Sequence, residues 1–230
     1  MNSKVDYRKV VCYNKNKNME GNGNMDMSPS KQKILDEALK LFAKNGYEAT
    51  SIEQITSAVG IKKASFYSHF KSKQEVLDWL INEIEERYKV YSQSLQKDWE
   101  AAREECKEAV RCTEEDIFNA IKRQFGFLAK DPFFCMARNF LTIEQFRNPQ
   151  LASLQNKCEY VDALNYHRKI IQYLVENGVL IDRDIEIMTY EFFSPIYVQF
   201  YQFLKEPECK QEAIRIVKKH IHHFFATYSK

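Results

Sequence analysis

Apolar residues recur at helical spacing along almost the whole chain, and this pattern constrains the fold more than any other feature. From Ser28 to Gly46 the apolar positions follow i, i+4, i+7 and i+8, which is one face of a helix: Ile34, Ala38, Leu41 and Phe42. Later segments of the same kind are separated by Gly and Pro, and no strand-like alternation persists. The sequence therefore predicts an all-α protein of about nine or ten helices.

Start and stop signals divide the pattern into segments. Ser28-Pro29 suits the start of the first helix, and Gly46 its end. Residues 97–111 are highly charged with little apolar face, which predicts an exposed helix end or a connector. The later helices are expected over 113–130, 132–149, 149–178, 182–204 and 206–228.

The first 28 residues lack this periodicity. They contain six Asn and two Gly, and such a composition cannot bury enough apolar surface to offset the entropy of ordering the chain. We predict a disordered N-terminal extension over residues 1–28. Met19, Met25 and Met27 leave open a later start of translation, and a functional basic arm is the other alternative.

Charge is distributed unevenly along the chain. The net charge is +2, yet residues 31–75 carry eight basic and five acidic side chains, and residues 76–230 are net acidic. A basic segment followed by a mildly acidic body is typical of a protein whose first part binds a polyanion.

Composition also excludes several classes of protein. The six Cys are scattered, without a C-x-x-C pair or zinc-like spacing, as is typical of a reducing cytosol. The apolar run near the start is too short for a signal peptide, and no stretch reaches the roughly 18 residues that span a bilayer. No nucleophile elbow, phosphate-binding Gly loop or paired-carboxylate motif occurs. We expect a soluble cytoplasmic protein that is not an enzyme and has no membrane segment, metal or cofactor.

Residues 30–75 predict three short helices and the start of a fourth. The second and third are joined by a tight turn at Gly60, which gives a helix-turn-helix over about residues 51–70. Thr50-x-x-Glu53 and Ser72-x-x-Glu75 predict capping boxes for the second and fourth helices. From Gly60 to Gln74 there are four Lys and no acidic residue, which favours a surface that faces phosphates.

Two runs in this segment carry a specific pattern: Thr50-Ser51-Ile52-x-x-Ile55-x-x-x-Val59-Gly60-Ile61 and Phe66-Tyr67-x-His69-Phe70-x-Ser72-Lys73-x-x-Val76-Leu77. Together they resemble the DNA-binding signature of the tetracycline-repressor (TetR/AcrR) family of transcriptional regulators. The resemblance covers about residues 29–80, and the Tyr-x-His-Phe-x-x-Lys run is its most specific part. It implies a helix-turn-helix DNA-binding domain over 29–75 and a helical effector-binding and dimerisation domain over 76–230.

The resemblance also implies which side chains contact DNA. They are Thr50, Ser51, Lys62, Lys63, Ser65, Tyr67, His69 and Lys73. Lys62, Lys63 and Ser65 are candidates for base edges or backbone, and the others for phosphates. The residues alone leave open that Tyr67 is in the core, that His69 is an ordinary surface residue, and that the two lysines are merely solvated. The family often has Ser as the cap at position 62, and the Lys here forgoes a cap worth about 1 kcal/mol.

Residues 113–230 hold 20 aromatic side chains. Such a bundle is usually simply core, and the family resemblance adds the alternative of a cavity for an apolar effector. The candidate lining residues are Phe125, Phe134, Phe140, Tyr160, His167 and Tyr173. His167 is equally well explained as a polar anchor in such a pocket or as a core residue with its hydrogen bonds satisfied.

The last two helices carry strong apolar faces. In the family this pair packs against its copy, which implies a homodimer interface at Phe192, Ile196, Phe200, Phe203, Val217, Ile221 and Phe224. Burial within one subunit is the alternative. Pro195 is expected to kink the first of these helices. His220 and His223 share a helix face, but no third ligand is in view, so we predict no metal site.

The most complete interpretation is a homodimeric repressor on a palindromic double-stranded DNA operator, released by an unknown small hydrophobic effector. In this mechanism the effector moves the fourth helix, so that the two recognition helices no longer match one turn of DNA. The alternative is a DNA-binding regulator or architectural protein without an effector.

Overall fold

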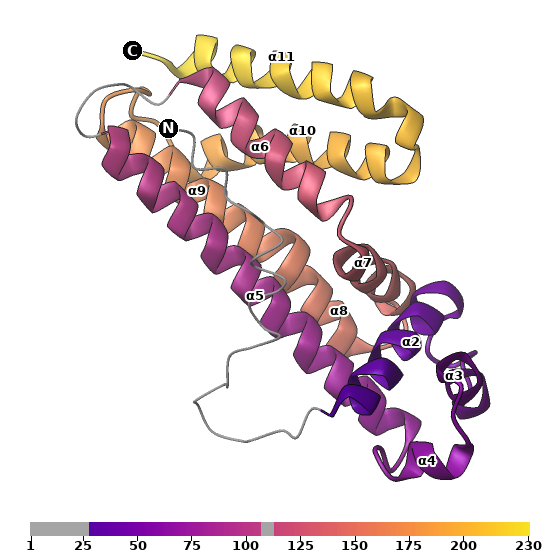
Figure 1. The fold of residues 1–230 in the computed structure, drawn as a ribbon. Coiled ribbons are helices and arrows are strands. Elements are labelled where there is room, and N and C mark those ends of the chain that lie inside the picture. Colours follow the sequence, from indigo (N-terminus) through magenta and orange to yellow (C-terminus); the bar gives the residue numbers. More distant parts are fainter. Residues whose placement is uncertain (1–27, 107–112) are drawn as a thin grey trace. The chain divides into compact units, whose positions relative to one another are not determined.

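The computed structural model describes residues 28–106 and 113–230 (Figure 1). Within them the chain is helical and contains no strand, so the all-α prediction is confirmed. The helices are α2 (Pro29–Asn45), α3 (Ile52–Val59), α4 (Lys63–Tyr67), α5 (Lys73–Cys106), α6 (Glu114–Leu128), α7 (Pro132–Glu144), α8 (Pro149–Asn156), α9 (Asp162–Glu176), α10 (Ile185–Lys205) and α11 (Lys210–Tyr228). Residues 1–27 of the extension predicted over 1–28, and residues 107–111 of the connector predicted over 97–111, lie outside the described residues.

Local capping chemistry sets the helix starts. Ser28 Oγ accepts a hydrogen bond from the Lys31 N–H at 3.3 Å, and Pro29 follows it as the first helical residue. Thr113 forms a capping box with Asp116 at the start of α6. Because each cap satisfies amide groups that have no partner inside the helix, the boundaries are specified within a few residues of sequence.

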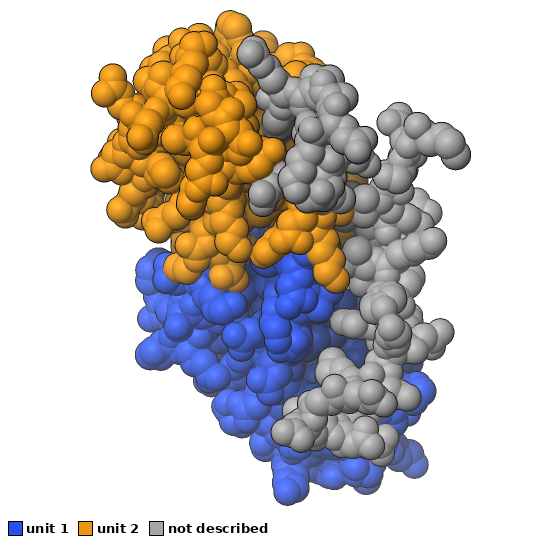
Figure 2. Space-filling model, turned by 90° about the vertical axis from the view of Figure 1, so that its left-hand side faces the viewer, with its two compact units in different colours: residues 1–94, 132–158 blue, residues 95–131, 159–230 orange. Residues whose placement is uncertain are grey.

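The chain divides into two compact units (Figure 2). Among the described residues, unit 1 comprises 28–94 and 132–158, and unit 2 comprises 95–106, 113–131 and 159–230. Helix α5 therefore begins in unit 1 and ends in unit 2. The sequence predicted a different division, which concerns function. It places a DNA-binding domain over 29–75 and a helical body over 76–230, and it stays a proposal.

Helix α2 forms the centre of unit 1 and packs against α3 and α7. Its buried face is Ile34, Leu35, Ala38, Leu39 and Phe42. The Phe42 ring lies 5.6 Å from the ring of Phe140 on α7, and Phe134 lies 4.9 Å from Tyr88 on α5. Phe134 and Phe140, which the sequence suggested for an effector pocket, are therefore core residues of unit 1.

Unit 2 has a core shared by α6, α9, α10 and α11. Its members come from all four helices and, for Leu180, from the segment between α9 and α10: Ile117, Phe118, Ile121, Ile170, Ile171, Leu174, Leu180, Met188, Phe192, Ile196, Val217, Ile221, Phe224 and Phe225. The chain end is joined to this core, because the Ile181 N–H donates to the Tyr228 carbonyl at 2.7 Å. None of the described helices is both long and apolar enough to cross a membrane.

His167 lies in this core without a charged partner. Its Nδ1 donates to the Ala163 carbonyl at 2.8 Å, and its ring lies 4.9 Å from that of Phe193. Burial lowers the pKa of His167 to about 4, although the Ala163 carbonyl acts in the opposite direction. The folded protein therefore holds this imidazole neutral at pH values where the unfolded chain binds a proton.

Acid should destabilise the protein through His167. The unfolded pKa is about 6.5, so stability is fully present above that pH and is lost as the pH falls toward about 4, by up to about 3 kcal/mol. Urea unfolding at about pH 7 and about pH 4.5 should show a smaller loss for His167→Leu than for wild type. The control His223→Leu, at an exposed position, should behave as wild type. An equal loss in all three proteins would contradict this account.

Candidate nucleic-acid interface

The turn between α3 and α4 depends on a glycine. Gly60 has φ 79° and ψ 34°, in the left-handed region that side chains with a Cβ adopt at a cost. Its N–H donates to the Thr56 carbonyl at 2.9 Å, which closes the last turn of α3. The chain then passes through Ile61 into α4, whose Phe66 is fully buried, as is Phe70 just beyond it. The structure thus has two helices joined by a tight turn, as predicted.

The opposite face of α4 is exposed. Tyr67 is 49% exposed, and Lys62, Lys63 and Ser65 are also exposed. Lys62 occupies the N-cap position without a side-chain hydrogen bond, so the predicted absence of a cap is confirmed. The alternative that Tyr67 belongs to the core is wrong, because Phe66 and Phe70 fill the inward positions.

The four lysines between Gly60 and Gln74 are in different environments. Lys62 is exposed, and so is Lys71, which the sequence interpretation did not select although it lies in the same stretch. Lys63 forms an ion pair with Glu53, and hydrogen bonding to that carboxylate raises the Lys63 pKa and lowers the Glu53 pKa. Both side chains are exposed, and exposed pairs of this kind are weak enough to exchange for a phosphate.

The cap of α3 lies one residue later than predicted. Ser51 Oγ accepts from the Gln54 N–H at 3.2 Å, and Gln54 Oε1 accepts from the Ser51 N–H at 2.7 Å. Thr50 is buried, and its hydroxyl donates to the Gly46 carbonyl at 2.9 Å. The capping box is therefore Ser51-x-x-Gln54, and of the two candidates only Ser51 is placed to contact a ligand.

Lys73 holds the protein's own backbone. Its Nζ donates to the carbonyls of Tyr47 and Thr50 at 2.8 and 2.9 Å and lies 4.2 Å from the centre of the Tyr47 ring. Two of the three ammonium protons are thus used within unit 1. The predicted phosphate contact has only the third proton available, and the main role of Lys73 in this structure is to fasten the α2–α3 loop to α5.

Glu144, at the end of α7, holds the same loop from another side. This carboxylate is buried, and its Oε1 accepts from the Tyr47 N–H at 2.8 Å. Gly46 has φ 83°, and a Cβ there would lie 2.9 Å from Glu144 Oε1. The sequence interpretation missed this contact because no local pattern links residues that lie 97 positions apart.

Residues 34–79 match the family described as bacterial regulatory proteins, tetR family. Over that segment, about a fifth of its length, this chain is similar to the family. It is 47% identical over 51 residues to the uncharacterised HTH-type transcriptional regulator YerO of Bacillus subtilis, and 46% identical over 46 residues to IcaR of Staphylococcus epidermidis, the negative transcriptional regulator of the biofilm operon icaADBC. These matches cover 22% and 20% of this chain, and only 18% and 25% of the two relatives.

The fold of this chain is also similar to solved structures. SmeT, the repressor of the Stenotrophomonas maltophilia multidrug efflux pump SmeDEF, aligns with a TM-score of 0.56 at 20% identity over 89% of this chain and 92% of SmeT. SmeT has also been solved in complex with triclosan.

The other residues suggested for an effector pocket are divided between the two units. Phe125, Tyr160, His167 and Tyr173 belong to unit 2, whereas Phe134 and Phe140 belong to unit 1. Within unit 2, Tyr173 packs against Trp99 at 5.4 Å and Tyr160 against Tyr197 at 5.2 Å. No contact in the described part of the structure tests these residues as the lining of an effector pocket, and the pocket over this set stays a prediction.

The residues suggested for a homodimer interface are mostly core residues of unit 2 in this structure. Phe192, Ile196, Phe200, Val217, Ile221 and Phe224 are buried within unit 2, and Phe203 is partly buried. A side chain that is already buried in its own subunit offers little surface to a second copy, and an interface at these positions stays a prediction. On α10 a different apolar stripe is exposed, with Ile187, Tyr190 and Val198 at 52%, 47% and 51%.

Replacing Lys73 should destabilise the fold, whereas replacing Lys71 should not. Lys73→Met keeps the stem but removes two charge-assisted hydrogen bonds to carbonyls, which should lower the free energy of unfolding by about 1–3 kcal/mol. Lys71→Met changes an exposed side chain and should stay within about 0.5 kcal/mol of wild type. Urea denaturation of the three proteins measures both effects, and equal stability of the two variants would refute the fastening role.

Proposed function

We propose that this protein is a DNA-binding transcriptional repressor and that residues 29–75 bind its operator. The exposed face of α4 is the observation that carries the proposal. Lys62, Ser65 and Tyr67 present hydrogen-bond donors to solvent, and no carboxylate occurs between Gly60 and Gln74 to repel phosphate. In a helix-turn-helix, the second helix enters the major groove, which assigns α4 to base edges and phosphates.

The side chains divide into two roles. Tyr67 and His69, with Lys71 added, are assigned to phosphates, where they set position without reading sequence. Lys62, Lys63 and Ser65 are assigned to base edges, since an ammonium can donate to guanine O6 and N7. Repression, rather than activation, is supported by IcaR, which is a negative regulator, and by SmeT, which is a repressor. A regulator of bacterial DNA acts in the cytoplasm, and we propose that location.

Tyr67→Phe should weaken binding to every duplex by about the same factor. The change removes one hydroxyl from an exposed ring and leaves the buried Phe66 and Phe70 in place, so the fold should be unaffected. One hydrogen bond to a charged phosphate is worth about 1.5–3 kcal/mol, or roughly a 10-fold to 100-fold loss of affinity. The control Ser153→Ala, which removes an exposed hydroxyl from α8, should bind as wild type. Wild-type affinity for Tyr67→Phe at moderate salt would show that the hydroxyl does not contact DNA.

We also propose that two copies associate through the exposed stripe of α10. Ile187, Tyr190 and Val198 lie at helical spacing, and a helix that leaves such a stripe in water gains from covering it. Two copies related by a two-fold axis place two α4 helices on the DNA, and a palindromic operator with half-sites about 34–36 Å apart matches that symmetry.

Val198→Glu should convert a dimer into a monomer. A carboxylate within an apolar interface loses its hydration without gaining a partner, which disfavours association. Light scattering at micromolar concentration should report the mass of two chains for wild type and of one chain for the variant. Gln202→Glu changes an exposed polar position on α10 and should remain a dimer. A wild-type monomer, or a variant that stays dimeric, would contradict the assignment.

Release by a small apolar effector is the remaining part of the proposal. SmeT in complex with triclosan shows that a protein of this fold binds an apolar phenol. The alternative, a regulator or architectural protein without an effector, differs in that no small molecule lowers its affinity for DNA.

A further inference from the structure

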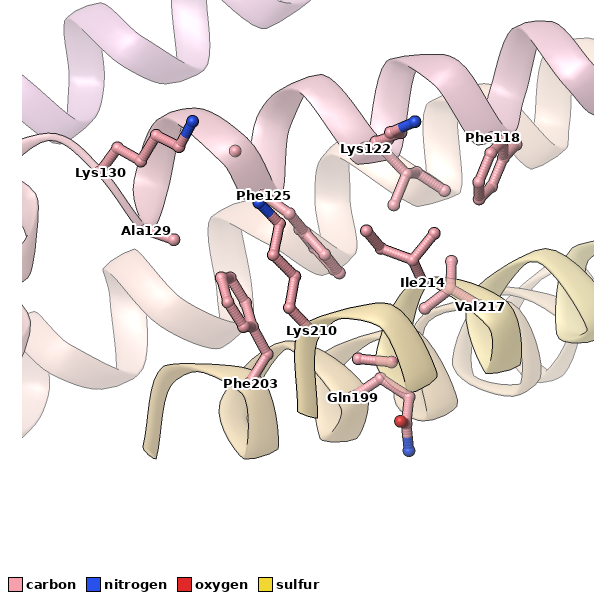
Figure 3. Close-up of a pocket in the computed structure, with 13 residues that line it drawn as sticks. Phe118, Lys122, Phe125, Ala129, Lys130, Gln199, Phe203, Lys210, Ile214 and Val217 are labelled. Atoms are coloured by element: carbon pink, nitrogen blue, oxygen red, sulfur yellow. The ribbon is translucent and has the colours of Figure 1, made fainter. Parts of the chain in front are cut away.

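Unit 2 contains a cavity of about 210 Å³ between α6, α10 and α11 (Figure 3). Its wall is mostly apolar: Phe118, Ile121, Phe125, Gly126, Ala129, Phe203, Ala213, Ile214 and Val217, with Gln199. Of the residues that the sequence suggested for a pocket, Phe125 alone lines it.

Three lysines complete the lining, and no acidic residue does. Lys122 and Lys130 come from α6 and the turn after it, and Lys210 comes from the start of α11. All three are exposed, and none forms an ion pair with another described residue. In Figure 3 the Lys210 side chain extends from α11 toward Phe125 on α6. An apolar cavity bordered by unneutralised ammonium groups is complementary to a molecule with an apolar body and a negative end.

The size of the cavity limits the body of the ligand. An engineered apolar cavity of about 150 Å³ holds one benzene molecule, so this one accommodates a single substituted ring or an acyl chain of medium length. Gly126 leaves its side of the cavity open, because a Cβ built there meets no atom within 4 Å.

We propose that this cavity binds a small organic carboxylate, with its apolar ring or acyl body between α6 and α11 and its carboxylate among Lys122, Lys130 and Lys210. Apolar burial supplies binding energy, and the ammonium groups favour the charged form over a neutral analogue of equal length. The site differs from the set of aromatic residues suggested by the sequence, and its lysines specify a charge that the sequence did not predict.

The same site provides a means of regulation. The cavity lies between α10 and α11, and α10 also carries the exposed stripe Ile187, Tyr190 and Val198. A ligand that separates α6 from α10 and α11 would change how these helices pack against one another. A change in the position of α10 would in turn affect the proposed dimer. This regulatory step rests on the proposed function, whereas binding of the carboxylate does not.

Binding is tested on the full chain with octanoate and with its neutral analogue octanamide. Titration calorimetry and thermal melting should show octanoate binding at least about 10-fold more tightly than octanamide, and only octanoate binding should weaken at high salt. In Lys122→Gln/Lys130→Gln/Lys210→Gln the affinity for octanoate should fall to that for octanamide. The control Lys205→Gln/Lys219→Gln removes exposed lysines outside the cavity and should bind octanoate as wild type does.

Gly126→Leu tests the location of the site. The added side chain enters open space on a helix, where Leu is favoured over Gly, so the fold should be kept while binding of both compounds is lost. Equal affinity for octanoate and octanamide, or unchanged binding in either cavity variant, would overturn the proposal. Failure of wild type to bind octanoate, together with a changed oligomeric state in Gly126→Leu, would show instead that a second copy covers the cavity.

The regulatory step has its own readout. Octanoate should lower the affinity of the wild-type protein for operator DNA and leave that of Gly126→Leu unchanged. Octanoate binding without an effect on DNA affinity would refute the regulatory step but leave the carboxylate-binding cavity supported. A protein that binds octanoate but no DNA would refute the proposed function and also leave the cavity supported.

Discussion

The short loop from Gly46 to Thr50 is fixed by two charged side chains, and the placement of the helix-turn-helix on its supporting helices depends on it. Glu144 of α7 accepts from the Tyr47 N–H, and Lys73 of α5 donates to the carbonyls of Tyr47 and Thr50. A buried amide or carbonyl without a partner costs about 1–3 kcal/mol, so the loop has one favoured conformation. The direction in which α3 leaves α2 follows from that conformation.

The division of α4 into two faces is the next consequence. Phe66 and Phe70 are buried against unit 1, which turns Tyr67, Lys62 and Ser65 outward. At its first turn the helix lacks a side-chain cap, since Lys62 makes no hydrogen bond there. The helix therefore lacks a stabilising cap at the position where Lys62 presents a positive charge to solvent. A local loss of stability at an exposed charged side chain is typical of functional surfaces.

Local features of this chain could be predicted from sequence because their causes are local. The starts of α2 and α6, the turn at Gly60 and the inward Phe66 all follow from cap chemistry, backbone conformation or helical spacing. The cap of α3 was misplaced by one residue, because Thr50 and Ser51 both offer a hydroxyl, and the burial of Thr50 against Gly46 decides between them. The contacts of Glu144 and Lys73 join the loop from Gly46 to Thr50 to helices that are distant in the sequence, and no local sequence pattern indicates such contacts.

The apolar faces of α10 and α11 illustrate a second limit. Periodicity shows that Phe192 and Phe224 face something apolar, but it does not distinguish the subunit's own core from a second copy. Here α6 and α9 cover those faces, which leaves Ile187, Tyr190 and Val198 as the candidate interface. The lysine-bordered cavity could not be predicted for the same reason, because Lys122 and Lys210 are brought together only by the packing of α6 on α11.

Selection of bound fragments from a pool of random duplex DNA tests the central claim, that the exposed face of α4 reads an operator, most directly. The account predicts enrichment of an inverted repeat whose half-sites are about one helical turn apart, or about 10 base pairs centre to centre. With Lys62→Ala, the selected bases should change at one position in each half-site. A pool that remains random after repeated selection, or an enriched sequence that is the same for both proteins and lacks two-fold symmetry, would contradict it.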